Sequence, residues 1–173
     1  MQAFITLLAA ATVVLDAALI IKVLALFHPT SRAQILRGGR NYGLLAIFLL
    51  STLSVAGTLV MQYAFNLNPC DLCWWQRIFM YPIALISFIA LLKNMDISDV
   101  ADYILALSVF GFAVALYQHL LQILPAGSLI PCDPSNDCAI RSVFEFGFVT
   151  IPWMALTVFS AIFLIAILGR RKI

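Results

Sequence analysis

Long apolar segments alternate with short polar segments along the whole chain. Five apolar stretches occur, at residues 3–27, 44–65, 74–92, 103–124 and 146–168. Each is close to the roughly 20 residues that an α-helix needs to cross the hydrocarbon core of a bilayer. The pattern therefore predicts five membrane-spanning helices.

The polar segments between these helices are of two kinds. Residues 28–41, which include Pro29, Gly38 and Gly39, and residues 93–102 are short and polar, and we expect tight connections there. The other two connections, 66–73 and 125–145, contain all four cysteines. The cysteines therefore lie outside the apolar stretches.

The composition agrees with a protein embedded in a membrane. Of 173 residues, 64% are hydrophobic and 10% are charged, whereas a soluble domain has about 25% charged residues. Most of the chain must then be spanning helix, with room for about one domain. The net charge of +2 is small and scattered, which argues against nucleic acid as a partner, and no glycine-rich phosphate loop is present.

The basic residues predict the orientation, because Lys and Arg are enriched in short cytoplasmic loops. Eight of the ten fall at one end of the predicted helices and two at the other: Lys22, Arg32, Arg37, Arg40, Lys93, Arg170, Arg171 and Lys172 against Arg77 and Arg141. We expect a multi-pass protein of the cytoplasmic (inner) membrane with its C-terminus in the cytoplasm and, after five crossings, its N-terminus outside. The cysteine segments then face the periplasm or cell exterior, where disulfides persist.

The first apolar stretch carries two charged residues, Asp16 and Lys22. A cleaved signal peptide is an alternative interpretation, but the stretch lacks a basic leader and is longer than a typical signal core. We therefore favour a spanning helix. Asp16 is either a proton site, as intramembrane acids often are, or a carboxyl group that faces the bundle.

The cysteines form two closely spaced pairs, Cys70-Asp-Leu-Cys73 and Cys132-Asp-Pro-Ser-Asn-Asp-Cys138. Two crossings separate the pairs, so both lie on the same face of the membrane. A disulfide across so few residues gains little stability from loop closure, whereas C-x-x-C spacing suits thiol–disulfide exchange. The pattern favours labile, redox-active pairs. A structural zinc site and purely structural disulfides are weaker alternatives.

Cys73 is the better candidate for the activated thiol of the first pair. It lies where the third predicted helix begins, and the unpaired N–H groups and positive dipole end of a helix favour a thiolate. Arg77 follows one turn later on the same helix face and adds a permanent positive charge. Alternatively, Arg77 is a snorkelling arginine. The neighbouring Trp74 and Trp75 are interpreted as interfacial anchors.

These motifs resemble a known family. The run Pro69-Cys-Asp-Leu-Cys-Trp-Trp-Gln-Arg77, followed by Met80-Tyr-Pro82, resembles the first cysteine segment of the bacterial disulfide bond formation protein B (DsbB) family, and most closely its BdbC-like branch. Further matches follow in the same order: Tyr117-Gln-His-Leu-Leu-Gln122, Pro131-Cys132, Asp137-Cys-Ala139, Arg141, Gly147 and Ile151-Pro-Trp153. The resemblance covers residues 44 to 168, and the C-x-L-C-x-x-x-R run is highly specific.

The resemblance implies an all-α integral membrane protein with a four-helix transmembrane bundle, residues 44–173. The apolar pattern adds one extra N-terminal transmembrane helix and a basic cytoplasmic loop before it, residues 1–43. The resemblance also implies a protein-disulfide oxidoreductase that reoxidises a DsbA-like thioredoxin-fold thiol oxidase and passes the electrons to a quinone, ubiquinone or menaquinone. By the same resemblance, Cys132 is attacked by the partner and Cys138 completes that pair. Cys73 contacts the quinone beside Cys70, with support from Arg77.

His119, near the outer end of the fourth predicted helix, also maps to a quinone-contacting position, although an interfacial histidine is an equal alternative. Two features depart from the family pattern. Only five residues separate Cys132 from Cys138, which is shorter than in some members, and the N-terminal helix is extra. Vitamin K epoxide reductase is the nearest rival family, but its C-x-x-C follows the loop pair, whereas here it precedes it.

Overall fold

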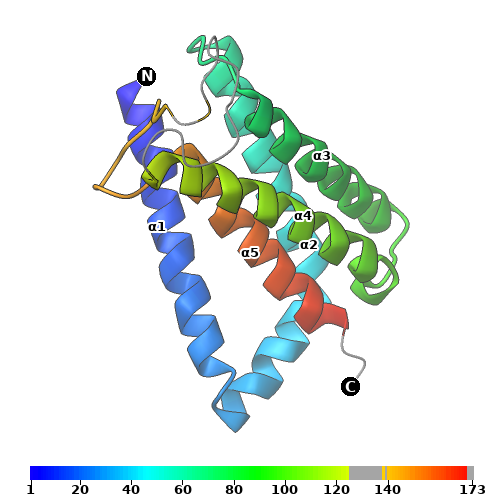
Figure 1. Cartoon of the computed structure of the whole chain (residues 1–173). Helices are drawn as coiled ribbons and strands as arrows, with labels where there is room; N and C mark the ends of the chain where they lie inside the picture. The colour runs from blue at the N-terminus through cyan, green and yellow to red at the C-terminus, as the bar shows by residue number, and fades with distance from the viewer. Residues whose placement is uncertain (125–137, 139, 171–173) are drawn as a thin grey trace.

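The computed structural model describes residues 1–124, 138 and 140–170. Its regular structure in this part of the chain is five α-helices: α1 (Gln2–Ala25), α2 (Pro29–Tyr63), α3 (Asp71–Leu92), α4 (Ile97–Ile123) and α5 (Ile151–Arg170) (Figure 1). Each contains a segment long and apolar enough to cross a membrane. The prediction of a multi-pass helical membrane protein is confirmed.

Helices α2 to α5 form a bundle, and α1 lies at its edge. Within the bundle α4 packs against α3 and α5, while α2 packs against α3 and α5. Helix α1 contacts mainly α5, and it diverges from α2 to make a V that opens toward the end where the N-terminus lies (Figure 1). The buried residues of α1, Ile5, Ala9 and Thr12, lie on one stripe in its first half. The bundle is therefore a four-helix unit with a fifth helix attached along one side.

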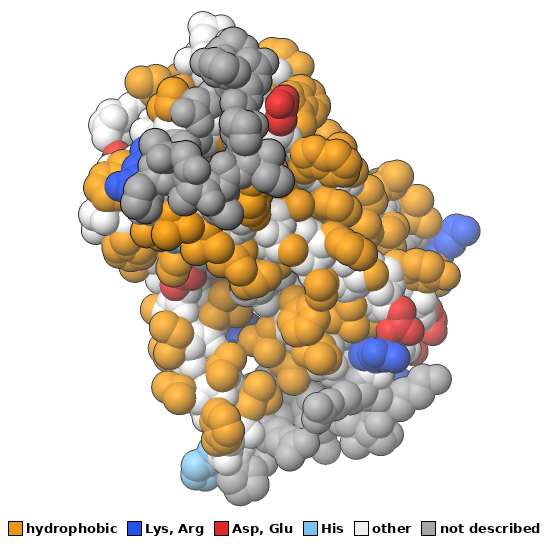
Figure 2. Space-filling view, in the orientation of Figure 1, with side chains coloured by type: hydrophobic (Ala, Val, Ile, Leu, Met, Phe, Trp, Pro, Cys, Tyr) orange, Lys and Arg blue, Asp and Glu red, His pale blue; other side chains and the backbone are white. Residues whose placement is uncertain are grey.

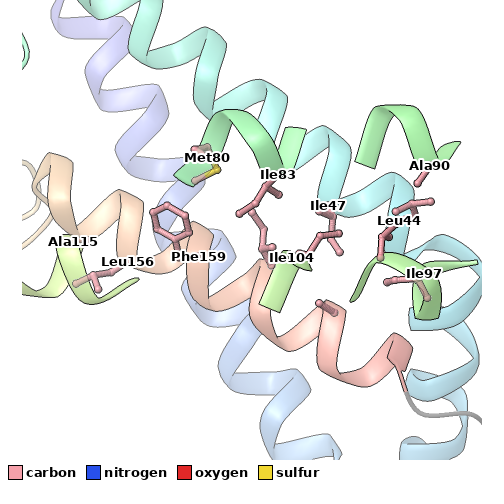
Figure 3. Packing of buried hydrophobic residues seen from close by; sticks show 13 residues of the cluster. Leu44, Ile47, Met80, Ile83, Ala90, Ile97, Ile104, Ala115, Leu156 and Phe159 are labelled. Atoms are coloured by element: carbon pink, nitrogen blue, oxygen red, sulfur yellow. The ribbon is translucent and has the colours of Figure 1, made fainter. Parts of the chain in front are cut away.

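The core of the bundle is apolar and closely packed. Ile47 of α2 lies close to Ile83 of α3 and Ile104 of α4, and Leu44 of α2 lies near Ala90 and Ile97 (Figure 3). Phe159 of α5 lies near Met80. The surface in Figure 2 is dominated by hydrophobic side chains, as expected for a protein surrounded by lipid. Ion pairs lie at the end of the bundle opposite the N-terminus, where Arg170 Nε is 3.0 Å from Asp102 Oδ1.

Helix α2 differs from the prediction at its N-terminal end. Residues 28–41 were expected to form a tight connection, yet α2 begins at Pro29 and continues through Gly38 and Gly39. Proline is compatible with the first turn of a helix because that turn needs no donated N–H. With 35 residues, α2 is roughly 52 Å long, so it exceeds the ~30 Å hydrocarbon core.

The start of two other helices also differs. Helix α4 begins at Ile97, after Asp96 at the N-cap, and not at residue 103. Helix α5 begins at Ile151 and not at residue 146, because the chain first makes a turn in which Glu145 and Val149 form an isolated β-bridge. Gly147 within that turn has φ +81°, a conformation that glycine adopts without strain. Phe146 and Phe148 extended the apolar stretch of the sequence into this turn.

Candidate functional site

The first cysteine pair lies at the N-terminus of α3. Cys70 is the N-cap, and its carbonyl oxygen accepts the N–H of Trp74 at 3.2 Å. Cys73 is the third helical residue, and its Sγ is 3.2 Å from that of Cys70. Both sulfurs therefore lie at the positive end of the helix dipole, near N–H groups that have no partner within the helix. This placement favours negative charge on sulfur.

A pair of buried glutamines holds the two sulfurs. The Gln118 amide of α4 donates to Cys70 Sγ at 3.2 Å and to Cys73 Sγ at 3.5 Å. Gln76 Nε2 donates to Gln118 Oε1 at 2.6 Å, which fixes the orientation of that amide. The residue pattern of the sequence does not single out either glutamine. The available signal was their position inside apolar stretches, since buried amides are costly unless they are hydrogen-bonded.

Arg77 is buried and connects α3 to α2. Its guanidinium donates to Gln62 Oε1 and, at 3.3 Å, to the carbonyl of Thr58. Its Cζ atom lies 5.0 Å from the centroid of the Trp74 ring, a cation–π distance. Arg77 is thus held in place by the bundle and does not extend to the solvent as a snorkelling arginine does.

The two thiols of the first pair are not equivalent. The hydrogen bond with Cys73 raises the pKa of the Cys70 thiol well above its ordinary value, and burial, the charge of Cys73 and a hydrogen bond with Cys138 raise it further. Cys70 therefore keeps its proton and donates it toward the sulfur of Cys73. The negative charge of the pair is expected on Cys73, beside the helix N-terminus and the Gln118 amide.

The second cysteine segment meets the first through Cys138. This residue is 2% exposed and lies next to Cys70, to which it is hydrogen-bonded. The segment is attached to the end of α4, where Arg141 Nε donates to the Gln122 carbonyl at 3.0 Å and Gln122 Nε2 donates to the Ile140 carbonyl at 3.3 Å. Cys70, Cys73 and Cys138 are free thiols in this structure. Cys132 lies outside the described residues.

A cavity of about 760 Å³ begins at these cysteines and extends between α1, α2 and α5. Cys73, Arg77 and Gln118 line its polar end. Most of its remaining walls are apolar side chains, contributed by α1, α2 and α5. Its size lies within the roughly 300–1,000 Å³ of small-molecule sites, and such sites combine apolar walls with a few polar groups.

His119 and Asp16 lie outside the lining of this cavity. His119 packs against α5, with its ring centroid 5.2 Å from that of Trp153, and its buried Nδ1 has no hydrogen-bond partner among the described residues. Asp16 faces the bundle, where its carboxylate accepts hydrogen bonds from Trp153 Nε1 at 3.0 Å and Thr157 Oγ1 at 2.7 Å. A quinone-contacting role for His119 stays a prediction, with no contact to the cavity to support it.

A helical membrane protein with cysteines from two segments gathered at one end of its bundle is built as a thiol–disulfide exchange protein. A family model described as "Disulfide bond formation protein DsbB" matches residues 40–169, and the chain belongs to this family. The resemblance seen in the cysteine motifs is thereby confirmed. The whole of α1 lies outside the matched region.

Three curated relatives are named for the same process. The SPbeta prophage-derived disulfide bond formation protein B of Bacillus subtilis is 36% identical over 119 residues, which are 69% of this chain and 79% of that protein. The probable disulfide formation protein C of Halalkalibacterium halodurans is 38% identical over 130 residues, 75% and 93% of the two chains. Disulfide bond formation protein C of Bacillus subtilis is 34% identical over 120 residues, 69% and 86%. The relatives support a role in disulfide bond formation and an oxidoreductase activity; no solved structure gives a significant match.

Proposed function

We propose that this protein is a membrane thiol:quinone oxidoreductase that reoxidises an extracytoplasmic, DsbA-type thioredoxin-like protein. Electrons pass through Cys132–Cys138 and then Cys70–Cys73 to a quinone, ubiquinone or menaquinone. The observation that carries the proposal is the contact of Cys138 with Cys70 at the polar end of an apolar cavity that Cys73 and Arg77 also line. The site thus brings the first cysteine pair, Cys138 of the second pair and a place for an electron acceptor into one continuous arrangement.

The first exchange takes place at the second cysteine pair. A thiolate of the reduced partner attacks Cys132, the Cys132–Cys138 bond breaks, and Cys138 is released as a thiolate. The second thiol of the partner then attacks the mixed disulfide and releases Cys132. The partner leaves with a disulfide, and its two electrons stay on Cys132 and Cys138.

The second exchange transfers these electrons to the first pair. The Cys138 thiolate attacks Cys70 in the Cys70–Cys73 disulfide, and Cys73 leaves as a thiolate. Contact between Cys138 and Cys70 supports this choice of target, and the thiol that is better stabilised as an anion leaves faster. Cys132 then attacks Cys138, which restores the second disulfide and releases Cys70, and the high pKa of Cys70 favours its protonation.

The residues around the cavity fit a quinone. Its polar end has a thiol pair, a guanidinium and an amide, and its walls are apolar, as a ring with an isoprenoid tail requires. A quinone bound there supplies an acceptor for two electrons and two protons. Cys73 holds the negative charge beside that acceptor, Cys70 holds a proton that is released as the Cys70–Cys73 bond re-forms, and Arg77 stabilises negative charge developing at the polar end.

The test is a coupled assay with the purified protein, a reduced DsbA-type protein and a soluble quinone analogue. We expect reduction of one quinone for each partner disulfide formed, and no reduction by Cys73→Ser. With a partner variant whose second cysteine is replaced by serine, the mixed disulfide at Cys132 of the unaltered protein should accumulate, visible on a non-reducing gel. Quinone reduction that persists without the cysteines, or no quinone reduction by the unaltered protein, would overturn the proposal.

A further inference from the structure

One face of α1 forms a wall of the cavity. The side chains of Phe4, Leu8, Ala11, Leu15 and Ala18 all line it. Their spacing alternates between four and three residues, which places them in a single stripe along the helix. From Phe4 to Ala18 this stripe is about 21 Å long. The cavity therefore extends from the cysteines a considerable distance into the membrane along α1.

Helix α1 is attached to the bundle on a different side from this stripe. Asp16 accepts hydrogen bonds from Trp153 and Thr157 of α5, and Gln2 Nε2 donates to Glu145 Oε1 at 2.6 Å. These two attachments lie near the two ends of the stripe. They hold α1 against α5, so that the cavity lies between its lining face and α2, which this face approaches at Leu8 and Gly57. Without α1, this side of the cavity would open to lipid.

The polar and apolar parts of the cavity are continuous, which indicates its occupant. A molecule with a redox-active polar head and a long apolar tail places the head at Cys73 and Arg77 and the tail between α1 and α2. A lipid acyl chain would satisfy only the apolar part. The wall residues farthest from the cysteines, such as Ala18 of α1 and Leu50 of α2, have no role unless the occupant extends that far.

We propose that α1 is the outer wall of a channel for the isoprenoid tail of the quinone, and that it selects quinones by their tail. This inference rests on the proposed function, since it assigns a binding surface to the same quinone. It also gives the helix outside the family match a specific role: it converts a groove open to lipid into a walled channel. The Asp16 contacts with α5 keep that wall in position.

The test compares two neighbouring alanines of α1. Ala18 lines the channel, whereas Ala17 is exposed and does not line it. Ala18→Phe fills the far end of the channel and leaves the cysteine end unchanged; Ala17→Phe adds the same ring on the lipid side. Both variants are assayed with a long-tailed quinone and with a tail-less analogue. Binding is measured separately from turnover, by quinone quenching of tryptophan fluorescence in a Cys73→Ser background.

We expect Ala18→Phe to raise both KM and Kd for the long-tailed quinone roughly tenfold, because the ring displaces buried tail methylenes. The KM and Kd for the tail-less analogue should not change in Ala18→Phe. Ala17→Phe should leave the KM and Kd of both quinones unchanged. Ala11→Phe, with exposed Ala3→Phe as its control, repeats the comparison if Ala18→Phe does not fold. If the lining and control variants have the same KM and Kd for the long-tailed quinone, the role of α1 in tail binding is overturned, while the proposed function is unaffected. Failure of the unaltered protein to reduce either quinone would instead overturn the proposed function.

Discussion

At the scale of single residues, the two thiols of the first pair, Cys70 and Cys73, have different surroundings. The two thiols are three residues apart, yet one is the N-cap of α3 and the other lies within its first turn. Neighbouring cysteines and burial raise the pKa of Cys70. Cys73 has the helix terminus and the Gln118 amide beside it. A protonated thiol next to a stabilised thiolate is the arrangement from which a disulfide forms with release of a single proton.

The raised pKa of Cys70 can be measured by alkylation. In the reduced protein we expect Cys70 to remain unreactive toward iodoacetamide from neutral pH to beyond the ordinary thiol value of 9.0, because only the thiolate reacts. Replacing its main partner, Cys73→Ser, removes the thiolate charge that holds the proton. The pKa should then fall and the reaction should begin at lower pH. Mass spectrometry of the labelled peptide reports both rates, and equal reactivity of Cys70 in the two proteins would contradict the coupling.

Arg77 shows how far residue types alone predict the site. The sequence placed a charge one turn after Cys73, and this was sufficient to single out the arginine. It did not predict the hydrogen bonds of Arg77 to α2, nor the glutamines, because these contacts join residues from different helices. Pairwise contacts between helices depend on how the bundle packs, and a single sequence does not state that packing.

Substitution of Arg77 separates a redox site from a structural disulfide. We expect Arg77→Ala to lower kcat/KM for quinone reduction roughly 100-fold, the size of effect seen when one preorganised donor is lost. Arg77→Lys keeps the charge but cannot donate in the fork geometry that reaches both Gln62 and the Thr58 carbonyl, so its activity should be intermediate. The coupled assay measures both variants. Unchanged activity in Arg77→Ala would favour the structural-disulfide alternative.

At the scale of helices, the apolar stretches predicted which elements exist but not where they end. A run of about 20 apolar residues has few structures open to it in a bilayer, so all five helices were predicted. Their ends lie in water or at the interface, where polar residues continue a helix as readily as they end it. Gly38 and Gly39 lie inside α2, whereas apolar Phe146 lies in a turn with φ +53°. Composition is uninformative at such boundaries.

The contact between α4 and α5 depends on Gly111. A Cβ atom there would lie 2.3 Å from the ring of Phe159, which is fully buried, so the ring would have to shift. We expect Gly111→Ala to destabilise the protein by about 1–3 kcal/mol, the usual cost of overpacking, observed as a lower Tm in detergent. Gly57→Ala is the control, because its Cβ would meet Leu8 at an ordinary 3.9 Å. Gly111→Ala combined with Phe159→Leu should recover most of the loss.

At the scale of the whole molecule, the topology gathers the chemistry at one end. Helices α2 and α3 are joined by a short segment that ends at Cys70, and α4 leads toward Cys138 at the same end. An even number of crossings between two loops is enough to predict that they share a face. It does not predict that they touch. That contact depends on Arg141 and Gln122, which attach the second segment to the end of α4.

The charges predict the orientation of the whole bundle. This prediction can be tested with two single cysteines in a variant whose four native cysteines are serine. Exposed Tyr63 lies at the cysteine end of α2, and exposed Met95 follows α3 at the opposite end, near Arg40 and Arg170. Because basic residues are retained in the cytoplasm and acidic ones contribute little, the pairing of Arg40 and Arg170 with Asp96 and Asp102 should not reverse the orientation. In intact cells, a membrane-impermeant maleimide should label Tyr63→Cys but not Met95→Cys, which should react only after the membrane is opened. The reverse pattern would place the thiols in the reducing cytoplasm, where a disulfide-generating exchange has no use, and would overturn the assignment of direction.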